Sequence, residues 1–187
     1  MSNEEWRSLG RIEELGQQAG DFMRALAGHR ERMKAGKLKT EDQAGFGPEM
    51  MRWLKRMEVI GEMEDTPTEI ARLHTATLSA RMKLDAPTQE RVRLQIEREF
   101  SQLAEKKLTR PQRPDTARDE WYARRKTALD EATQRIEALI PAAQREQFAV
   151  GQSLHLGTGM RTKTDLRPDG HGSVYMMIDL PGLDWRF

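Results

Sequence analysis

The chain has 187 residues, of which 33% are charged and 37% are hydrophobic, and its 31 Lys and Arg nearly balance its 30 Asp and Glu. This balance favours long, solvent-exposed amphipathic helices over a compact α/β enzyme, and the interleaved charges argue against a nucleic-acid surface, which needs a cationic surplus. The absence of cysteine excludes disulfides, cysteine-ligated metals and thiol catalysis.

An N-terminal helix and linker are predicted for residues 1–47. Apolar side chains recur at three- and four-residue steps from Trp6 to Leu26, which predicts an amphipathic helix over about residues 3–35. Four glycines interrupt this helix, each at a cost of up to about 1 kcal/mol relative to alanine: Gly10, Gly16, Gly20 and Gly28. We therefore expect the helix to need a partner surface.

A helical hairpin domain is predicted for residues 48–150. Pro48 and Pro67 suit the first turns of two helices, and Asp85 is placed to cap a third by accepting backbone N–H bonds. A proline-containing turn over residues 109–115 then separates the third helix from the longest one, which we expect to end near Leu139.

Residues 151–187 are predicted to form a separate glycine-containing tail. Alternating and β-branched residues predict two short strands, Met160–Arg167 and Ser173–Leu180, which make a hairpin-like extension. The fold class expected for the whole chain is therefore all-α, with long antiparallel helical hairpins of about four to five helices and a short C-terminal β-hairpin-like extension.

Two similar six-residue stretches stand at the helix corners of the hairpin domain, the places where one predicted helix ends and the chain turns. Leu84-Asp85-Ala86-Pro87-Thr88-Gln89 stands at the first, and Leu139-Ile140-Pro141-Ala142-Ala143-Gln144 at the second. In each, a leucine is followed five residues later by glutamine, with a proline between them. Over residues 48–150 the chain resembles the Spy/CpxP-like family of bacterial envelope proteins, which carries two LTxxQ motifs in an all-helical hairpin fold. Leu84 with Gln89, and Leu139 or Ile140 with Gln144, stand in the places of these motifs.

The resemblance implies an exported, often dimeric helical cradle without catalytic residues or cofactors. Some members of that family bind unfolded proteins without ATP, some restrain stress-signalling sensors, and some sense metals. The expected partners are therefore unfolded protein clients or a sensor protein, together with a second copy of the chain, and no nucleic acid. The helix-corner role is carried over to Leu84, Gln89, Leu139 and Gln144.

The cellular location stays open between two expectations. The N-terminus, from Met1 to Glu5, is acidic and has no signal-peptide core, and no apolar run reaches the roughly 20 residues that span a bilayer. We expect a periplasmic protein whose signal or anchor has been removed, which would be its only link to the membrane. The alternative is a cytoplasmic protein.

Candidate partner-binding residues are apolar. Flexible methionines adapt to varied apolar shapes, and a cluster of them surrounds one tryptophan: Met50, Met51, Trp53, Met57 and Met63. Trp121 and Tyr122, beside the basic run Arg124–Lys126, form a possible cationic aromatic rim. The simpler interpretation is that the methionines fill the core and that the basic residues form an ordinary polar face.

No catalytic constellation or metal site is expected. The chain has four histidines and none shows HExxH spacing. We expect His74 to be a half-buried, hydrogen-bonded histidine on a helix flank. The sequence thus predicts a non-enzymatic protein-binding protein of the envelope, with a cytosolic assembly module and a metal-responsive periplasmic sensor as alternatives.

Overall fold

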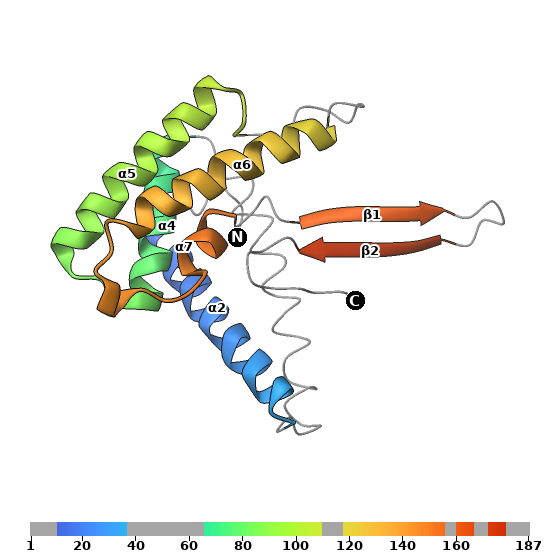
Figure 1. Ribbon diagram of the computed structural model, residues 1–187, viewed down its shortest axis with the longest axis horizontal. Coiled ribbons are helices and arrows are strands. Elements are labelled where there is room, and N and C mark those ends of the chain that lie inside the picture. The colour runs from blue at the N-terminus through green and yellow to red at the C-terminus, as the bar shows by residue number, and fades with distance from the viewer. Residues whose placement is uncertain (1–10, 37–65, 110–117, 156–159, 167–171, 179–187) are drawn as a thin grey trace.

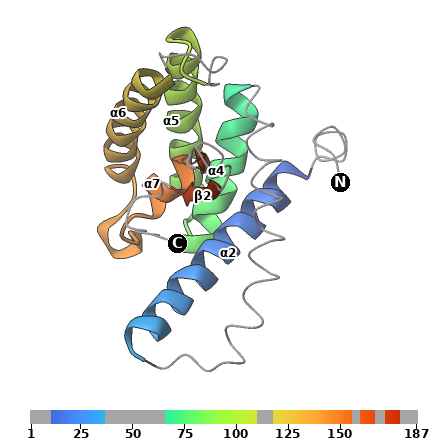
Figure 2. The ribbon, with the colours of Figure 1, turned by 90° about the vertical axis from the view of Figure 1, so that its right-hand side faces the viewer.

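The computed structural model describes residues 11–36, 66–109, 118–155, 160–166 and 172–178, and this part of the chain is mostly helical. The all-α character predicted from the sequence is thereby confirmed. The helices are α2 (Ile12–Lys34), α4 (Pro67–Met82), α5 (Ala86–Glu105), α6 (Arg118–Glu137), the 3₁₀ helix η1 (Ala142–Gln144) and α7 (Ala149–Leu154). Helices α4, α5, α6 and α7 gather into one body, and α2 crosses α4 and extends beyond it (Figures 1 and 2).

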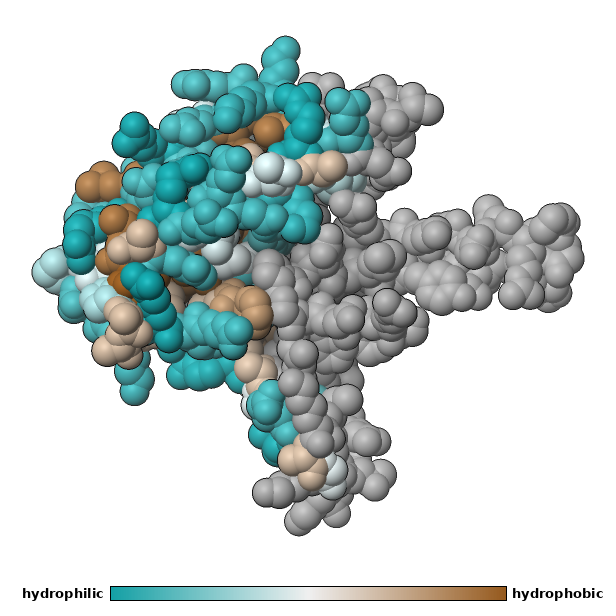
Figure 3. Space-filling view, in the orientation of Figure 1, coloured by the Kyte–Doolittle hydropathy of each residue, from teal (hydrophilic) through white to brown (hydrophobic). Residues whose placement is uncertain are grey.

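The hydrophobic core lies among α4, α5, α6 and α7. Its largest fully buried apolar side chains come from α4, α5, α6 and the segment just after α6: Ile70, Leu78, Ile96, Phe100, Leu129, Ile136 and Ile140. Hydrophilic residues make up most of the coloured surface in Figure 3, with hydrophobic ones in small patches between them. The exposed charged faces predicted from the composition are therefore the outer faces of core-packed helices.

Helix α7 extends the core past the predicted domain boundary at residues 150–151. Ala149, Val150 and Leu154 are all buried and belong to the core cluster. The described helical part of the chain therefore continues to the end of α7.

Two glycines of α2 allow it to approach α4 closely. A Cβ on Gly16 would lie 2.4 Å from the carbonyl oxygen of Leu73, and one on Gly20 would lie 2.5 Å from that of Thr77. The facing residues on α4 are also small, since Ala76 lies opposite the first glycine. The glycines that weaken α2 as an isolated helix are thus the residues that let it pack on its partner surface.

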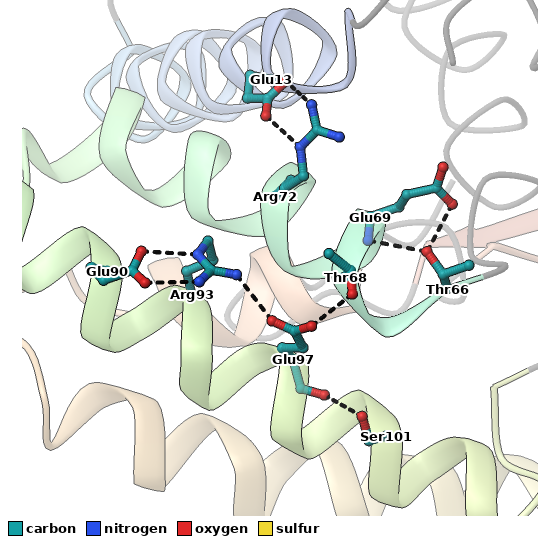
Figure 4. Close-up of polar contacts among 9 residues, drawn as sticks. All are labelled: Glu13, Thr66, Thr68, Glu69, Arg72, Glu90, Arg93, Glu97 and Ser101. Carbon is teal, nitrogen blue, oxygen red and sulfur yellow. Dashed lines mark hydrogen bonds and ion pairs between the residues drawn. The ribbon is translucent and has the colours of Figure 1, made fainter. Parts of the chain in front are cut away.

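Polar contacts at the edges of the helices fix their relative positions. Arg72 of α4 donates to both carboxylate oxygens of Glu13 of α2, at 2.6 and 3.0 Å, and the Thr68 hydroxyl donates to Glu97 of α5 at 2.6 Å (Figure 4). These groups are partly exposed, so each contact contributes less than about 1 kcal/mol. They orient helices whose association depends on apolar burial.

Helices α4 and α5 each begin with a polar N-cap residue. The hydroxyl of Thr66 accepts from the backbone N–H of Glu69 at the start of α4, at 3.2 Å (Figure 4). Helix α4 ends at Lys83, whose φ of 52° is left-handed, and Asp85 then accepts from the backbone N–H of Thr88 at 2.8 Å. Hydrogen bonds from the backbone N–H and the side chain of Thr88 hold the pKa of Asp85 below its usual value. Asp85 is the N-cap of α5, as predicted from the sequence.

An ion pair with one buried partner joins α5 to α6. Arg135 donates to both oxygens of the Glu99 carboxylate, at 2.7 and 2.9 Å, and Gln95 donates to the same group at 2.6 Å. The Glu99 side chain is only 5% exposed, whereas that of Arg135 is 47% exposed. The Arg135 hydrogen bonds keep the pKa of Glu99 low despite its burial.

Two strands follow α7, β1 (Met160–Leu166) and β2 (Gly172–Ile178). Their backbones pair antiparallel, from Met160 opposite Ile178 to Leu166 opposite Gly172. In Figure 1 they point away from the helices. Separately, none of the described helices is both long enough and apolar enough to cross a bilayer.

Replacing Gly16 by alanine is expected to lower the free energy of unfolding by about 1–3 kcal/mol, because the new Cβ would overlap the backbone of α4. Gly28→Ala is the matched control in the same helix. Its nearest neighbour is the Arg32 side chain at 3.6 Å, so helix propensity should raise stability by up to about 1 kcal/mol. Urea unfolding followed by circular dichroism measures both variants, and stabilisation by both would contradict the close packing of α2 on α4.

Candidate functional site

The two helix corners use the same type of hydrogen bond. At the first corner, Nε2 of Gln89 donates to the carbonyl oxygen of Leu84 at 2.6 Å. At the second, Nε of Arg145 donates to the carbonyl oxygen of Ile140 at 2.7 Å. In both, the donor stands five residues after a buried aliphatic residue and satisfies its carbonyl group as the chain turns.

At the second corner, the residues that make the contact lie one position later than Leu139 and Gln144, the pair expected from the sequence. Leu139 is only half-buried against the core, and the Gln144 side chain has a buried oxygen with no hydrogen-bond donor among the described residues. Sequence reasoning missed Arg145 because it searched for a second glutamine. The available signal was Ile140, which gives the same five-residue interval when it is taken as the leading residue.

The buried guanidinium of Arg81 joins the two corners. Its side chain, at the end of α4, is 1% exposed and pairs with the Glu146 carboxylate just beyond η1. Its Nη1 also donates to Oε1 of Gln152 in α7 at 2.9 Å. The sulfur of the neighbouring Met82 accepts from the backbone N–H of Glu146 at 3.5 Å. The end of α4 is thereby fixed to α7 and to the segment between η1 and α7.

A pocket of about 380 Å³ opens at this second corner. Its apolar lining comes from three buried residues, Met82, Ile140 and Val150, and from the exposed ring of Phe148. Its charged lining consists of the carboxylates of Asp130, Glu137 and Glu146 and the guanidinium of Arg145. The pocket therefore combines an apolar interior with a charged edge.

Phe148 occupies an unusual backbone position. Its φ of +64° is left-handed, a region that costs a non-glycine residue about 1–2 kcal/mol, and its side chain gives α7 no capping hydrogen bond. It is also one of two large hydrophobic residues exposed among the described side chains, at 43%, the other being Leu94 at 53%. Burial in the core therefore does not explain the strained backbone of Phe148.

A second, more polar pocket of about 560 Å³ lies among α2, α4 and α5. Its charged lining residues are largely paired with one another, as in Glu13 with Arg72 and Glu90 with Arg93, the latter at 2.8 Å (Figure 4). Ion pairs already formed and solvated leave little net charge to recognise a ligand. The pocket at the second corner is the stronger candidate site.

His74 and Ser153 lie as close together as a catalytic base and its nucleophile, but both side chains are fully buried. Nδ1 of His74 lies 3.2 Å from the Ser153 hydroxyl, and the imidazole stacks on Phe100 with ring centroids 5.4 Å apart. Both His74 and Ser153 are 0% exposed, so a substrate has no access to them in this conformation. His74 is thus more deeply buried than its helix-flank position indicated, because α7 covers that side of α4.

The burial of His74 keeps its imidazole neutral. Loss of hydration, and then the positive charge of Arg125, lowers the pKa of His74 to about 3. Burial likewise lowers the pKa of His155, although Asp130, whose Oδ1 lies 3.5 Å from its Nε2, opposes that shift. Within the described ranges, no group of three or more His, Cys, Asp or Glu side chains is arranged to hold a metal ion.

Most of the predicted partner-binding residues lie outside the described part of the chain. These are Met50, Met51, Trp53, Met57 and Met63. Trp121 and Tyr122 are described, and their rings meet edge to face with centroids 4.9 Å apart. The Trp121 indole donates to the carbonyl oxygen of Lys107 at 3.0 Å and lies 5.6 Å from the Arg125 guanidinium. Trp121 packs partly against the core, so it joins α6 to the end of α5.

No protein-family model matches this chain, and it shows no match to a curated protein or to a solved structure. The resemblance to the Spy/CpxP-like family therefore depends on the corner residues alone and gains no support from these comparisons.

Stability is expected to fall as the pH is lowered from about 6.5 towards 3, because the unfolded chain binds a proton at His74 that the folded protein does not. This linkage amounts to at most about 1.4 kcal/mol per pH unit. Urea midpoints between pH 6.5 and 5 measure it above the range where carboxylates titrate. The slope should be smaller for His74→Leu than for the wild type, and equal slopes would contradict the buried neutral imidazole.

Proposed function

We propose that this chain is a non-enzymatic protein-binding protein of the bacterial envelope, acting as an ATP-independent chaperone-like protein or as an adaptor of a stress sensor. The observation that carries the proposal is the apolar pocket at the second corner, with the exposed ring of Phe148 at its edge. An exposed aromatic side chain beside an apolar pocket is typical of a surface that buries part of another protein.

The charges of the helices suit the same role. Many are arranged as ion pairs, including the exposed pair of Lys126 with Asp130 and the partly buried pair of Arg93 with Glu97, at 2.6 and 3.0 Å. Such charges keep a protein with exposed apolar surface soluble and guide encounters, while apolar burial provides affinity. Because clients differ in shape, a few apolar contacts surrounded by charge suit weak and general binding.

The family resemblance, and with it the proposed location, depends on the residues of the two corners. In the first corner, Asp85 caps α5 where the LTxxQ motif has threonine, and Gln89 binds the carbonyl group of the leading leucine. The second corner repeats the carbonyl contact with Ile140 and Arg145. Export to the periplasm and dimerisation are parts of the proposal that follow from this resemblance.

The segments on either side of the helical body also have a place in the proposal. The methionine-rich stretch around Trp53 would add apolar binding surface, since thioethers adapt to varied shapes. The strands β1 and β2 would form a hairpin-like extension after α7. A lone two-stranded hairpin is marginal in water, so contact with a partner or a second copy would stabilise it.

The proposal predicts that the protein suppresses aggregation of an unfolding client without ATP. Light scattering of a chemically unfolded model protein, diluted into buffer with near-stoichiometric amounts of the full chain, measures this activity. A combined Met50→Ser, Trp53→Ala and Met57→Ser variant should protect the client several-fold less well than the wild type, because it loses apolar binding surface.

Leu94→Ser is the matched control, because it removes an exposed apolar residue of α5 outside the proposed surface. Circular dichroism establishes that each variant is folded. Lack of protection by a folded wild-type chain would overturn the chaperone-like role. If the combined variant failed to fold, its residues would be core and the binding surface would not include them.

A further inference from the structure

We infer that α7 is a releasable cover: entry of a proton at His74 favours detachment of α7, which uncovers apolar surface of α4 and α6 for the binding of another protein. This inference rests on the proposed protein-binding function, and it names a surface that takes part in binding and the condition that exposes it.

Helix α7 is held to the helical body by a small set of contacts. It has six residues, it contacts α4 and α6, and its buried apolar side chains are those of Ala149, Val150 and Leu154. A helix of this length is unstable in water by itself, because its nucleation is costly. The helical state of α7 therefore depends on its contacts with the rest of the body.

The imidazole of His74 lies under α7, in surroundings that do not accept a charge. The hydroxyl of Ser153 in α7 lies 3.2 Å from its Nδ1, and the Phe100 ring of α5 stacks on it. The charged groups that face it, Arg125 of α6 and His155 just after α7, repel a second positive charge. Nε2 of His74 is buried and has no hydrogen-bond partner among the described residues. A proton there would add a charged N–H group without an acceptor.

Release of α7 would remove this obstacle. Burial, and then the charges of Arg125 and His155, lowers the pKa of His74 to about 3 from an ordinary value of 6.5. Water entering from the side of α7 would move this pKa back towards its ordinary value, so the released form binds a proton that the closed form does not. Below about pH 6.5, acid therefore shifts the equilibrium towards release.

His155 acts in the same direction. It follows α7, and its Nε2 lies 3.5 Å from Oδ1 of Asp130 on α6. Burial lowers the pKa of His155, and the positive charges of Lys126 and Arg125 add to that effect, whereas Asp130 offsets only part of it. Protonation of either histidine is thus easier once α7 has left.

The start of α7 favours movement about Phe148. The φ of this residue is +64°, a strained value for phenylalanine, and its side chain makes no capping hydrogen bond. Arg81 contacts Glu146 before this position and Gln152 after it. Rotation at Phe148 would break only the second of these contacts, so the segment before α7 would stay in place when α7 leaves.

Detachment would uncover part of the hydrophobic core. Ala149, Val150 and Leu154 belong to one core cluster with apolar residues of α4 and α6, the helices that α7 contacts. A contiguous apolar surface of this kind is a site where part of another protein is buried. The face that α7 covers at neutral pH would then add binding surface for a client at lower pH.

The test measures the opening of α7 directly. The chain has no cysteine, so a single introduced thiol reports on one position. Val150→Cys places the thiol in α7, and Val92→Cys, the matched control, places it in α5; both valines are at most 1% exposed. Labelling by a pyridyl disulfide, slow enough for reclosing to outpace it, measures the open population. Each rate is divided by that of the same variant unfolded in urea at the same pH, which removes the titration of the thiol itself.

We expect Val150→Cys to be labelled at least about tenfold faster than Val92→Cys, because local opening is more frequent than global unfolding. Its relative rate should rise by up to about 30-fold from pH 7.5 to pH 5. Adding His74→Leu should remove most of this rise, whereas His29→Gln, which changes a buried histidine of α2, should leave it unchanged. Over the same pH interval, the wild type should protect an unfolding client several-fold better.

Equal labelling of the two thiols would mean that α7 leaves only on global unfolding, and it would overturn the inference. A rate for Val150→Cys that does not rise in acid would do the same, as would a rise without improved protection. Protection of a client at pH 7.5 in any of these cases would leave the proposed function standing. Protection at neither pH would overturn the proposed function, and the role of the uncovered surface with it.

Discussion

The buried guanidinium of Arg81 is the interaction on which the arrangement of the two corners depends. A cation enclosed at the end of α4 is tolerated only because Glu146 and Gln152 neutralise and hydrogen-bond it. Both partners follow η1, so this single side chain holds α7 and the segment before it against α4. The same segments line the pocket and supply Ser153, which contacts His74. The polar contacts of Arg81 therefore determine where α7 packs along α4, while apolar burial supplies most of the stability.

At the candidate site, the strained backbone of Phe148 lowers stability while its ring stays exposed to solvent. Most large hydrophobic side chains of the helical body are buried, and the positive φ angles of Lys83 and Lys107 stand at helix ends, where a left-handed residue ends the helix. Phe148 departs from both patterns, since it precedes a helix and is exposed. This combination of strain and exposure sets the second corner apart from the first, where Leu84 is buried and Gln89 completes an ordinary turn.

Much of the helical structure was predictable from the sequence, because the spacing of apolar residues and the residues that start or end helices act locally. The three- and four-residue spacing of apolar side chains, together with Pro67 and Asp85, placed the helices and one N-cap before any tertiary contact was known. The role of Gly16 and Gly20 was not predictable, because a glycine that weakens a helix and a glycine that admits a neighbouring backbone look the same in one sequence. The full burial of His74 and the strain at Phe148 were hidden for a similar reason, since both depend on how α7 folds back over α4.

The hydrogen bonds of the corners have a consequence for how such proteins diverge. Gln89 and Arg145 differ in chemistry, yet each reaches a carbonyl group five residues back, so the donor can change while the chain length between donor and acceptor is kept. An insertion or deletion inside a corner would break the bond, whereas an exchange among side chains with an N–H at the right reach would not. Related chains would then keep the five-residue spacing between donor and acceptor at each corner more strictly than the identity of the donor residue. A search for that spacing would find them more readily than a comparison of residue identities.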